Sequence, residues 1–173
     1  VPPQEQPLSQ SYGDRVSASP DANGHQYEMG NGWTPNIELS YSAPEPGPFP
    51  PAWRVWFGWD GDPATAYMPD GYGWDPWKYW ATFTPDAGWG VKLNSIDIDS
   101  WGTAPGSEIS WTVFDGVPDG PVLASGATGP FDNDITIDLG GVEHYGTVVL
   151  EIWHTAGPNT YLSMDDLNFD QVP

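Results

Sequence analysis

The chain has 173 residues and no cysteine, and its 24 acidic against four basic side chains give a formal net charge of −20. The lack of cysteine excludes disulfides, thiolate metal sites and a cysteine nucleophile. A field of this sign repels nucleic acid, anionic lipid and acidic polysaccharides, so we expect neutral partners or cations. No run of about 18 apolar residues occurs, and we therefore expect no membrane contact by this segment.

Glycine and proline account for 21 and 20 of the residues, while 14% of the chain is aromatic. In so aromatic a chain, this density predicts many turns rather than disorder, and it excludes long helices. The length suits one domain. We expect a flexible N-terminal arm over residues 1–11 and a single domain over residues 12–170, and we expect the protein to be a monomer.

Apolar and polar residues alternate in a series of short runs, which is the pattern of half-buried β-strands. The predicted strands are 37–41, 53–59, 79–84, 91–99, 108–114, 135–139, 147–153 and 161–169.

Turn-forming residues separate these strands, and one short helical turn could begin at Asp75 with Pro76. The predicted turns are 44–51, 60–63, 115–116, 119–120, 140–141 and 156–159. The sequence thus predicts an all-β fold, an antiparallel β-sandwich of the jelly-roll type with long Trp/Pro/Gly-rich loops.

Four segments of the chain form a set: Tyr12-Gly13-Asp14-Arg15-Val16, Gly30-Asn31-Gly32-Trp33-Thr34-Pro35-Asn36-Ile37, the run from Phe83 to Asp97, and the run from Leu162 to Phe169. In this order and spacing they resemble exported bacterial proteins that carry the PEP-CTERM sorting signal. The end of the chain, Gln171-Val172-Pro173, resembles the point just before that family's Pro-Glu-Pro motif, apolar helix and basic tail, which this sequence does not contain.

The resemblance implies a secreted or cell-surface domain from a bacterium that makes extracellular polysaccharide, and it implies no reaction. Asp165-Asp166 before an apolar run is also similar to the last strand of jelly-roll carbohydrate-binding modules. In those modules a carboxylate near the C-terminus often helps to hold a structural calcium beside the N-terminal strand.

The acidic residues near the two chain ends are candidate calcium ligands, since Ca²⁺ prefers carboxylate and carbonyl oxygens. Because neighbours in a strand point in opposite directions, only one of Asp165 and Asp166 should face such a site, and we select Asp166 together with Asp14. The alternative is that Asp14 caps a turn and the Asp pair only begins a strand. A structural Ca²⁺ is the one cofactor that the sequence suggests.

The sequence contains no catalytic motif. A glycosidase needs two carboxylates at a suitable separation, but among 24 acids some pair always satisfies that distance. No Gly-x-Ser-x-Gly elbow is present. We therefore expect no enzyme, with a glycoside hydrolase or lyase as the alternative.

Eleven tryptophans are the most unusual feature of the composition. Core packing is expected for Trp101, Trp111 and Trp153, which lie in or beside regular strands. Tryptophans of the tryptophan-rich stretch 53–89, of which Trp74, Trp77 and Trp89 lie in loop-like sequence, could instead stack on the C–H faces of sugars. Nearby polar side chains would accept hydrogen bonds from the sugar hydroxyls. The predicted carbohydrate-binding residues are Trp56, Trp59, Tyr72, Trp74, Asp75, Trp77 and Trp89.

Two functions follow from these observations. The first is a non-catalytic carbohydrate-binding domain of an exported bacterial protein, which would bind a neutral polysaccharide or exopolysaccharide through exposed tryptophans. The second is a structural or adhesive domain of the extracellular matrix that binds calcium and has no glycan ligand.

Overall fold

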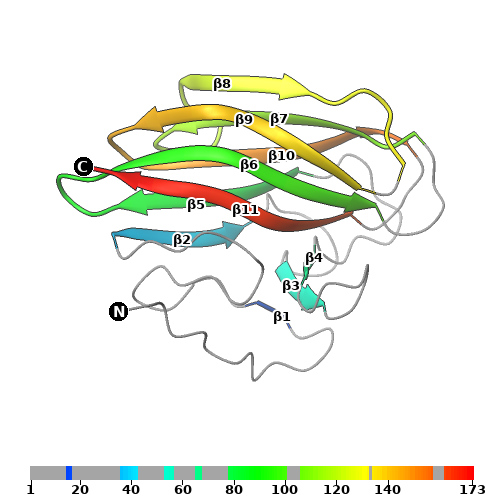
Figure 1. Ribbon diagram of the computed structural model, residues 1–173, viewed down its shortest axis with the longest axis horizontal. Helices are drawn as coiled ribbons and strands as arrows, with labels where there is room; N and C mark the ends of the chain where they lie inside the picture. The colour runs from blue at the N-terminus through cyan, green and yellow to red at the C-terminus, as the bar shows by residue number, and fades with distance from the viewer. Residues whose placement is uncertain are drawn as a thin grey trace.

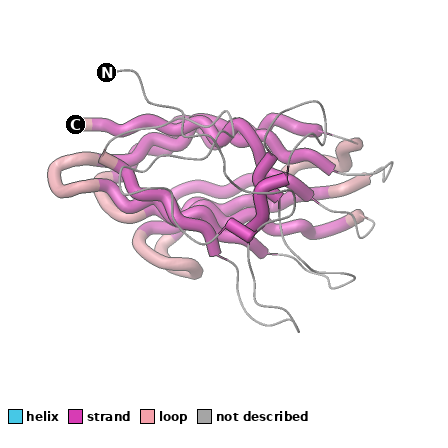
Figure 2. Tube along the Cα trace, turned by 90° about the horizontal axis from the view of Figure 1, so that it is seen from below, coloured by secondary structure: helices cyan, strands magenta, loops and turns pink. Residues whose placement is uncertain are grey.

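The computed structural model describes residues 15–16, 36–42, 53–56, 65–67, 78–100, 106–132, 134–157 and 162–173. Every regular element in these ranges is a β-strand, and the strands form two antiparallel sheets that pack against each other (Figure 1, Figure 2). The predicted β-sandwich is confirmed, and the jelly-roll connection of the strands stays a prediction. The described residues include no helix that is long and apolar enough to cross a membrane.

One sheet has six strands, and its order does not follow the chain. Across the sheet the strands are β1 (Arg15–Val16), β3 (Trp53–Trp56), β4 (Thr65–Tyr67), β11 (Leu162–Val172), β6 (Gly90–Ser100) and β9 (Asp134–His144).

The other sheet has five strands, with β10 in its middle. Its order is β2 (Ile37–Ser42), β5 (Lys78–Pro85), β10 (Val148–Ala156), β7 (Glu108–Asp115) and β8 (Val122–Ala127).

The hydrophobic core lies between the sheets and is built from alternate residues of the strands, as a period of two requires. In β5, Tyr79, Ala81 and Phe83 are buried in this core. Phe83 meets Phe169 of β11 edge to face, with ring centroids 5.1 Å apart. This aromatic pair joins the two sheets and stabilises their packing.

The predicted turn at Gly140 and Gly141 is wrong, because both residues lie inside β9. Their φ angles of 76° and 63° are left-handed, a conformation that glycine adopts without strain. The register of β9 against β6 shifts at this point, and the Gly140 N–H donates to Asp138 Oδ1 at 2.8 Å. Two glycines therefore make a bulge in a continuing strand.

The edge strand β8 was not predicted, because Val122-Leu123-Ala124-Ser125-Gly126-Ala127 has small residues where large apolar ones would mark a strand. It pairs with β7, and the connection between them contains the predicted turns at 115–116 and 119–120. Gly126 lies under the Trp111 ring, where a Cβ would come within 2.7 Å of the indole. The short strands β1 and β4 were also not predicted.

Several sequence predictions lie outside the described residues. These are the arm over 1–11, the turns at 44–51 and 60–63, and the helical turn at Asp75 and Pro76.

Candidate functional site

The β5–β6, β7–β8 and β9–β10 turns lie at the same end of the sandwich (Figure 1, left end). Large apolar side chains are exposed in or beside two of these turns. Tyr145, in the β9–β10 turn, has 67% of its surface exposed, and Val117 and Val122 border the β7–β8 turn with 60% and 59%. Contiguous exposed apolar surface is typical of interaction sites, and these three side chains belong to turns at the same end.

Hydrogen bonds join the β7–β8 turn to the β9–β10 turn. His144 Nε2, at the end of β9, lies 2.9 Å from Asp115 Oδ1, at the end of β7. The Gly116 N–H donates to the carbonyl oxygen of Thr147 at 2.8 Å. Tyr145 and Val117 are each within two residues of this connection, so they lie on neighbouring turns.

Trp89, a predicted sugar-binding residue, lies at the same end in the β5–β6 turn. The backbone N–H of Trp89 donates to the Asp86 carbonyl oxygen at 3.0 Å. Gly88 has a φ of 88°, as the third position of a type II turn requires. Trp89 is half-buried. A Cβ on the next residue, Gly90, would lie 3.2 Å from Tyr145 Cδ1, so the tyrosine ring packs beside the backbone next to Trp89. We call Trp89, Val117, Val122 and Tyr145 the turn-end surface.

A second group of side chains lies on the outer face of the five-stranded sheet. In β10, Val148, Leu150 and Ile152 point into the core cluster, so Glu151 and Trp153 lie on the opposite face. Glu151 is nevertheless buried, with 5% of its side chain exposed. A charge in such a position requires a partner of opposite charge and satisfied hydrogen bonds.

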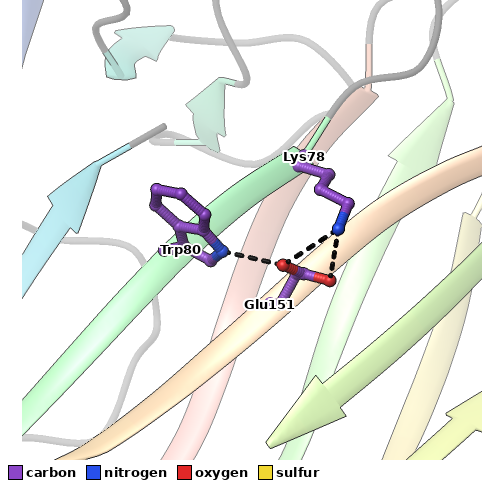
Figure 3. A network of polar contacts seen from close by, with 3 residues as sticks. All are labelled: Lys78, Trp80 and Glu151. Atoms are coloured by element: carbon purple, nitrogen blue, oxygen red, sulfur yellow. Dashed lines mark hydrogen bonds and ion pairs between the residues drawn. The ribbon is translucent and has the colours of Figure 1, made fainter. Parts of the chain in front are cut away.

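Two residues of β5 supply these partners (Figure 3). The indole N–H of Trp80 donates to Glu151 Oε2 at 2.9 Å. Lys78 Nζ lies 3.3 Å from Oε1 and 3.5 Å from Oε2 of the same carboxylate. The ammonium group also lies 4.7 Å from the centre of the Trp153 ring. We call Lys78, Trp80, Glu151 and Trp153 the Glu151 cluster.

The members of the Glu151 cluster differ in their access to solvent. Lys78 keeps 31% of its side chain exposed, and Trp80 and Trp153 are half-buried. The Trp153 Nε1 atom is buried and finds no acceptor in the part of the chain that the structure describes. A ligand could therefore meet the lysine and the two indole rings, while Glu151 holds them in place from below.

The position of Trp153 corrects the prediction that it packs in the core, because it lies on the outer face of β10. The alternation of β10 is uninformative here, since both of its faces are buried over Val148–Ile152. Trp111 packs against the core cluster as predicted. Trp101 lies outside the described residues.

The structure does not bring all the predicted sugar-binding residues together. Trp56 is the last residue of β3 and pairs with Thr65 of β4. The next residue of β4, Ala66, pairs with Met164 of β11. Trp89 precedes Gly90, which pairs with Val172 at the other end of β11. Eight residues of strand separate these ends, or about 26 Å. Trp59, Tyr72, Trp74, Asp75 and Trp77 lie outside the described residues.

The predicted metal pair falls where the structure describes little. Asp14 is outside the described residues. The next residue, Arg15, begins β1, which is the third strand away from β11 in the sheet, or roughly 14 Å. Asp166 lies in β11, where the register moves from Asp165 opposite Asp97 to Asn168 opposite Ser95. Three steps on one strand thus match two on the other, and the alternation that favoured Asp166 over Asp165 does not hold at such a bulge.

Acidic positions face one another across the six-stranded sheet. Asp97 is paired in register with Asp165, and Asp99 with Asp134. Within the ranges whose side chains are described, no three His, Asp or Glu residues lie close enough to hold a metal ion.

Sequence reasoning missed Tyr145, Lys78 and Glu151 as site residues. The signal for the last two was present, since Glu151 is the one charged residue in the apolar run Val148-Val149-Leu150-Glu151-Ile152-Trp153 and the chain offers only four basic partners. Comparison with known proteins adds no assignment: no protein-family model matches the chain, and no curated protein matches its sequence.

Proposed function

We propose that this chain is a non-catalytic carbohydrate-binding domain of an exported bacterial protein, and that the turn-end surface binds a neutral glycan. The observation that carries the proposal is that a half-buried Trp89 and a largely exposed Tyr145 lie on two turns at the same end of a β-sandwich, with the tyrosine ring beside Gly90. Loops on a rigid scaffold are common places for binding residues.

Aromatic side chains suit this role because a sugar presents a flat C–H face that stacks on a ring, while the polar edge of the ring can form hydrogen bonds. Tyr145 is held in place before any ligand arrives. Its hydroxyl donates to the Pro173 carbonyl oxygen at 3.0 Å, and the residue before it, His144, contacts Asp115. A ring that is already ordered loses less entropy on binding.

The charge of the chain supports a neutral ligand. A net charge of −20 disfavours uronic or sulfated glycans by long-range repulsion, whereas uncharged sugars experience no such penalty. The other predicted tryptophans, Trp56, Trp59, Trp74 and Trp77, with Tyr72 and Asp75, stay predictions as further contacts.

The test is retention of the protein on neutral polysaccharides by affinity electrophoresis, after a screen on a glycan array. We expect Tyr145→Ala and Trp89→Ala each to weaken binding at least tenfold, because each removes a stacking ring. Tyr145→Phe is the matched control, since it keeps the ring and loses only the bond to Pro173. Unchanged retention of both alanine variants would refute the site, and no binding of the folded protein to any neutral glycan would refute the function.

A calcium-binding structural or adhesive domain is the second candidate. It is favoured by the register of the six-stranded sheet, which sets Asp97 opposite Asp165 and Asp99 opposite Asp134. Like charges directly opposite each other repel, and a divalent cation relieves that repulsion. Sedimentation of the protein with and without Ca²⁺ tests it. Calcium-dependent self-association without glycan binding would favour this candidate, and an unchanged monomer would exclude it.

A further inference from the structure

Lys78 is the least tightly held member of the Glu151 cluster. The carboxylate makes its shortest contact with the Trp80 N–H, at 2.9 Å, whereas the lysine ammonium lies 3.3 and 3.5 Å from the two oxygens. Tight charge-assisted hydrogen bonds are usually about 2.7–2.9 Å long. Lys78 is also 31% exposed and is the first residue of β5, so its flexible stem can leave the cluster without disturbing the strand.

The remaining three residues have the chemistry of an ammonium-binding site. Glu151 supplies a negative charge with little access to water, and the face of the Trp153 ring lies where it attracts a cation. Trp80 fixes the carboxylate through its N–H (Figure 3). Cross-strand pairing holds these groups together, since Trp80 is opposite Glu151 and Lys78 is opposite Trp153.

We propose that Glu151, Trp80 and Trp153 form a binding site for a primary ammonium group, which the chain's own Lys78 fills and which an ammonium-bearing ligand enters by displacing it. The exchange replaces one cation by another, so the buried carboxylate keeps its counter-charge throughout. The displaced Lys78 ammonium moves from a half-buried position into water, where its hydration offsets the lost contacts.

The ligand class follows from the charge of the chain together with the proposed function. A protein with a net charge of −20 attracts cations, and in a glycan without amine-bearing substituents the primary ammonium is carried by an amino sugar that is not N-acylated. We therefore assign the site to a free amino sugar. This assignment of the ammonium's source rests on the proposed carbohydrate binding, whereas the ammonium chemistry of the site does not.

The first experiment tests the chemistry with Lys78→Met, which keeps the stem and removes the charge. The probe is n-butylammonium, with n-butanol as the uncharged control, and the readouts are the melting temperature and tryptophan fluorescence. We expect a saturable rise in melting temperature with butylammonium alone, and at least tenfold tighter binding to K78M than to the wild-type chain, in which Lys78 competes. If K78M does not fold, recovery of folding with butylammonium is the same test.

Adding Glu151→Gln to K78M must abolish the response, because the site then has no negative charge. Equal binding of butylammonium to wild type and K78M, a response that survives E151Q, or an equal response to butanol would each overturn the site.

The second experiment tests the ligand class on the wild-type chain with a glucosamine oligomer, its N-acetylated counterpart and a lysine-containing peptide. We expect binding of the glucosamine oligomer to fall at least tenfold in E151Q and to persist in Tyr145→Ala. Equal binding of the N-acetylated oligomer at this site, or tighter binding of the peptide, would overturn the assignment to an amino sugar. Because Tyr145→Ala tests the turn-end surface alone, failure of the proposed function and failure of this site remain distinguishable.

Discussion

Two lysine–glutamate pairs, one on each sheet, have the same separation and opposite surroundings. Lys78 and Glu151 of the five-stranded sheet lie 3.3 Å apart, as do Lys92 and Glu143 of the six-stranded sheet. Glu151 has 5% of its side chain exposed, whereas Glu143 has 50%. Both pairs join neighbouring antiparallel strands.

The comparison shows that burial, rather than distance, decides what such a pair does. An exposed pair gains little, since water solvates each charge almost as well as the partner does. A buried carboxylate has lost its water, so removing its partner leaves a charge that nothing compensates. In the Glu151 cluster a buried carboxylate therefore depends on its partners, while Lys92 and Glu143 form a solvated pair.

The largest expected effect is that of Lys78→Met, which leaves Glu151 buried without a counter-charge. We expect it to lower the free energy of unfolding by about 3 kcal/mol, measured by urea denaturation. The double variant Lys78→Met/Glu151→Met should recover to within about 1 kcal/mol of wild type, since apolar groups of similar size replace both charges. If K78M lowers the free energy of unfolding no more than the loss of an exposed pair does, then Lys78–Glu151 and Lys92–Glu143 do not differ as argued.

Glu151→Gln should cost less, about 1 kcal/mol in the same urea experiment. The amide oxygen can still accept the Trp80 N–H, and the Lys78 ammonium, being 31% exposed, can take its hydrogen bonds from water. A larger cost for E151Q than for K78M would show that the lysine, not the carboxylate, is the group that needs compensation.

Asp97→Asn should raise stability by about 0.5 kcal/mol, because it removes a charge that lies in register with Asp165 on the acidic sheet. The gain should shrink in high salt, which screens this repulsion. Glu38→Gln serves as the control, since Glu38 is exposed and pairs with Thr84 rather than with an acid. An equal gain from both variants would mean that overall charge, and not the opposed pair, sets the effect.

The smallest expected effect is that of Lys92→Met. It should lower the free energy of unfolding by less than about 0.5 kcal/mol, and the loss should vanish at about 1 M salt. Thermal unfolding at low and high ionic strength measures it. A loss of unfolding free energy as large as that caused by K78M would contradict the conclusion that burial decides the strength of such a pair.

The strands with regular alternation were predicted well from the sequence. The runs that became β5, β6 and β7 differ from the structure by at most one residue at either end, because a period of two fixes which residues share a face. Prediction failed where local pattern and tertiary context differ. Strand β8 has small residues that only pairing with β7 makes into a strand, and Gly140 and Gly141 became a bulge because β6 continues beside them.

For the candidate sites, the sequence predicted that Trp89 lies in a loop-like segment, and in the structure it lies in the β5–β6 turn. The sequence did not select Tyr145, whose exposure depends on turns from β5–β6 and β9–β10 meeting at one end. It also could not unite Lys78 with Glu151, which lie 73 residues apart and meet only because β5 and β10 pair.

The sequence by itself determined that this is an all-β sandwich with a strongly acidic surface, since alternation, turn residues and charge are local properties of the chain. Only the tertiary structure decided which face of each strand is the core, and hence that Trp153 lies with Lys78 and Glu151 on the outer face. The physical reason is that alternation sorts side chains into two sets, whereas the pairing and packing of distant strands decide which set is covered. The burial of Glu151 beside its partners therefore depends on the packing of the strands, which the local sequence pattern does not determine.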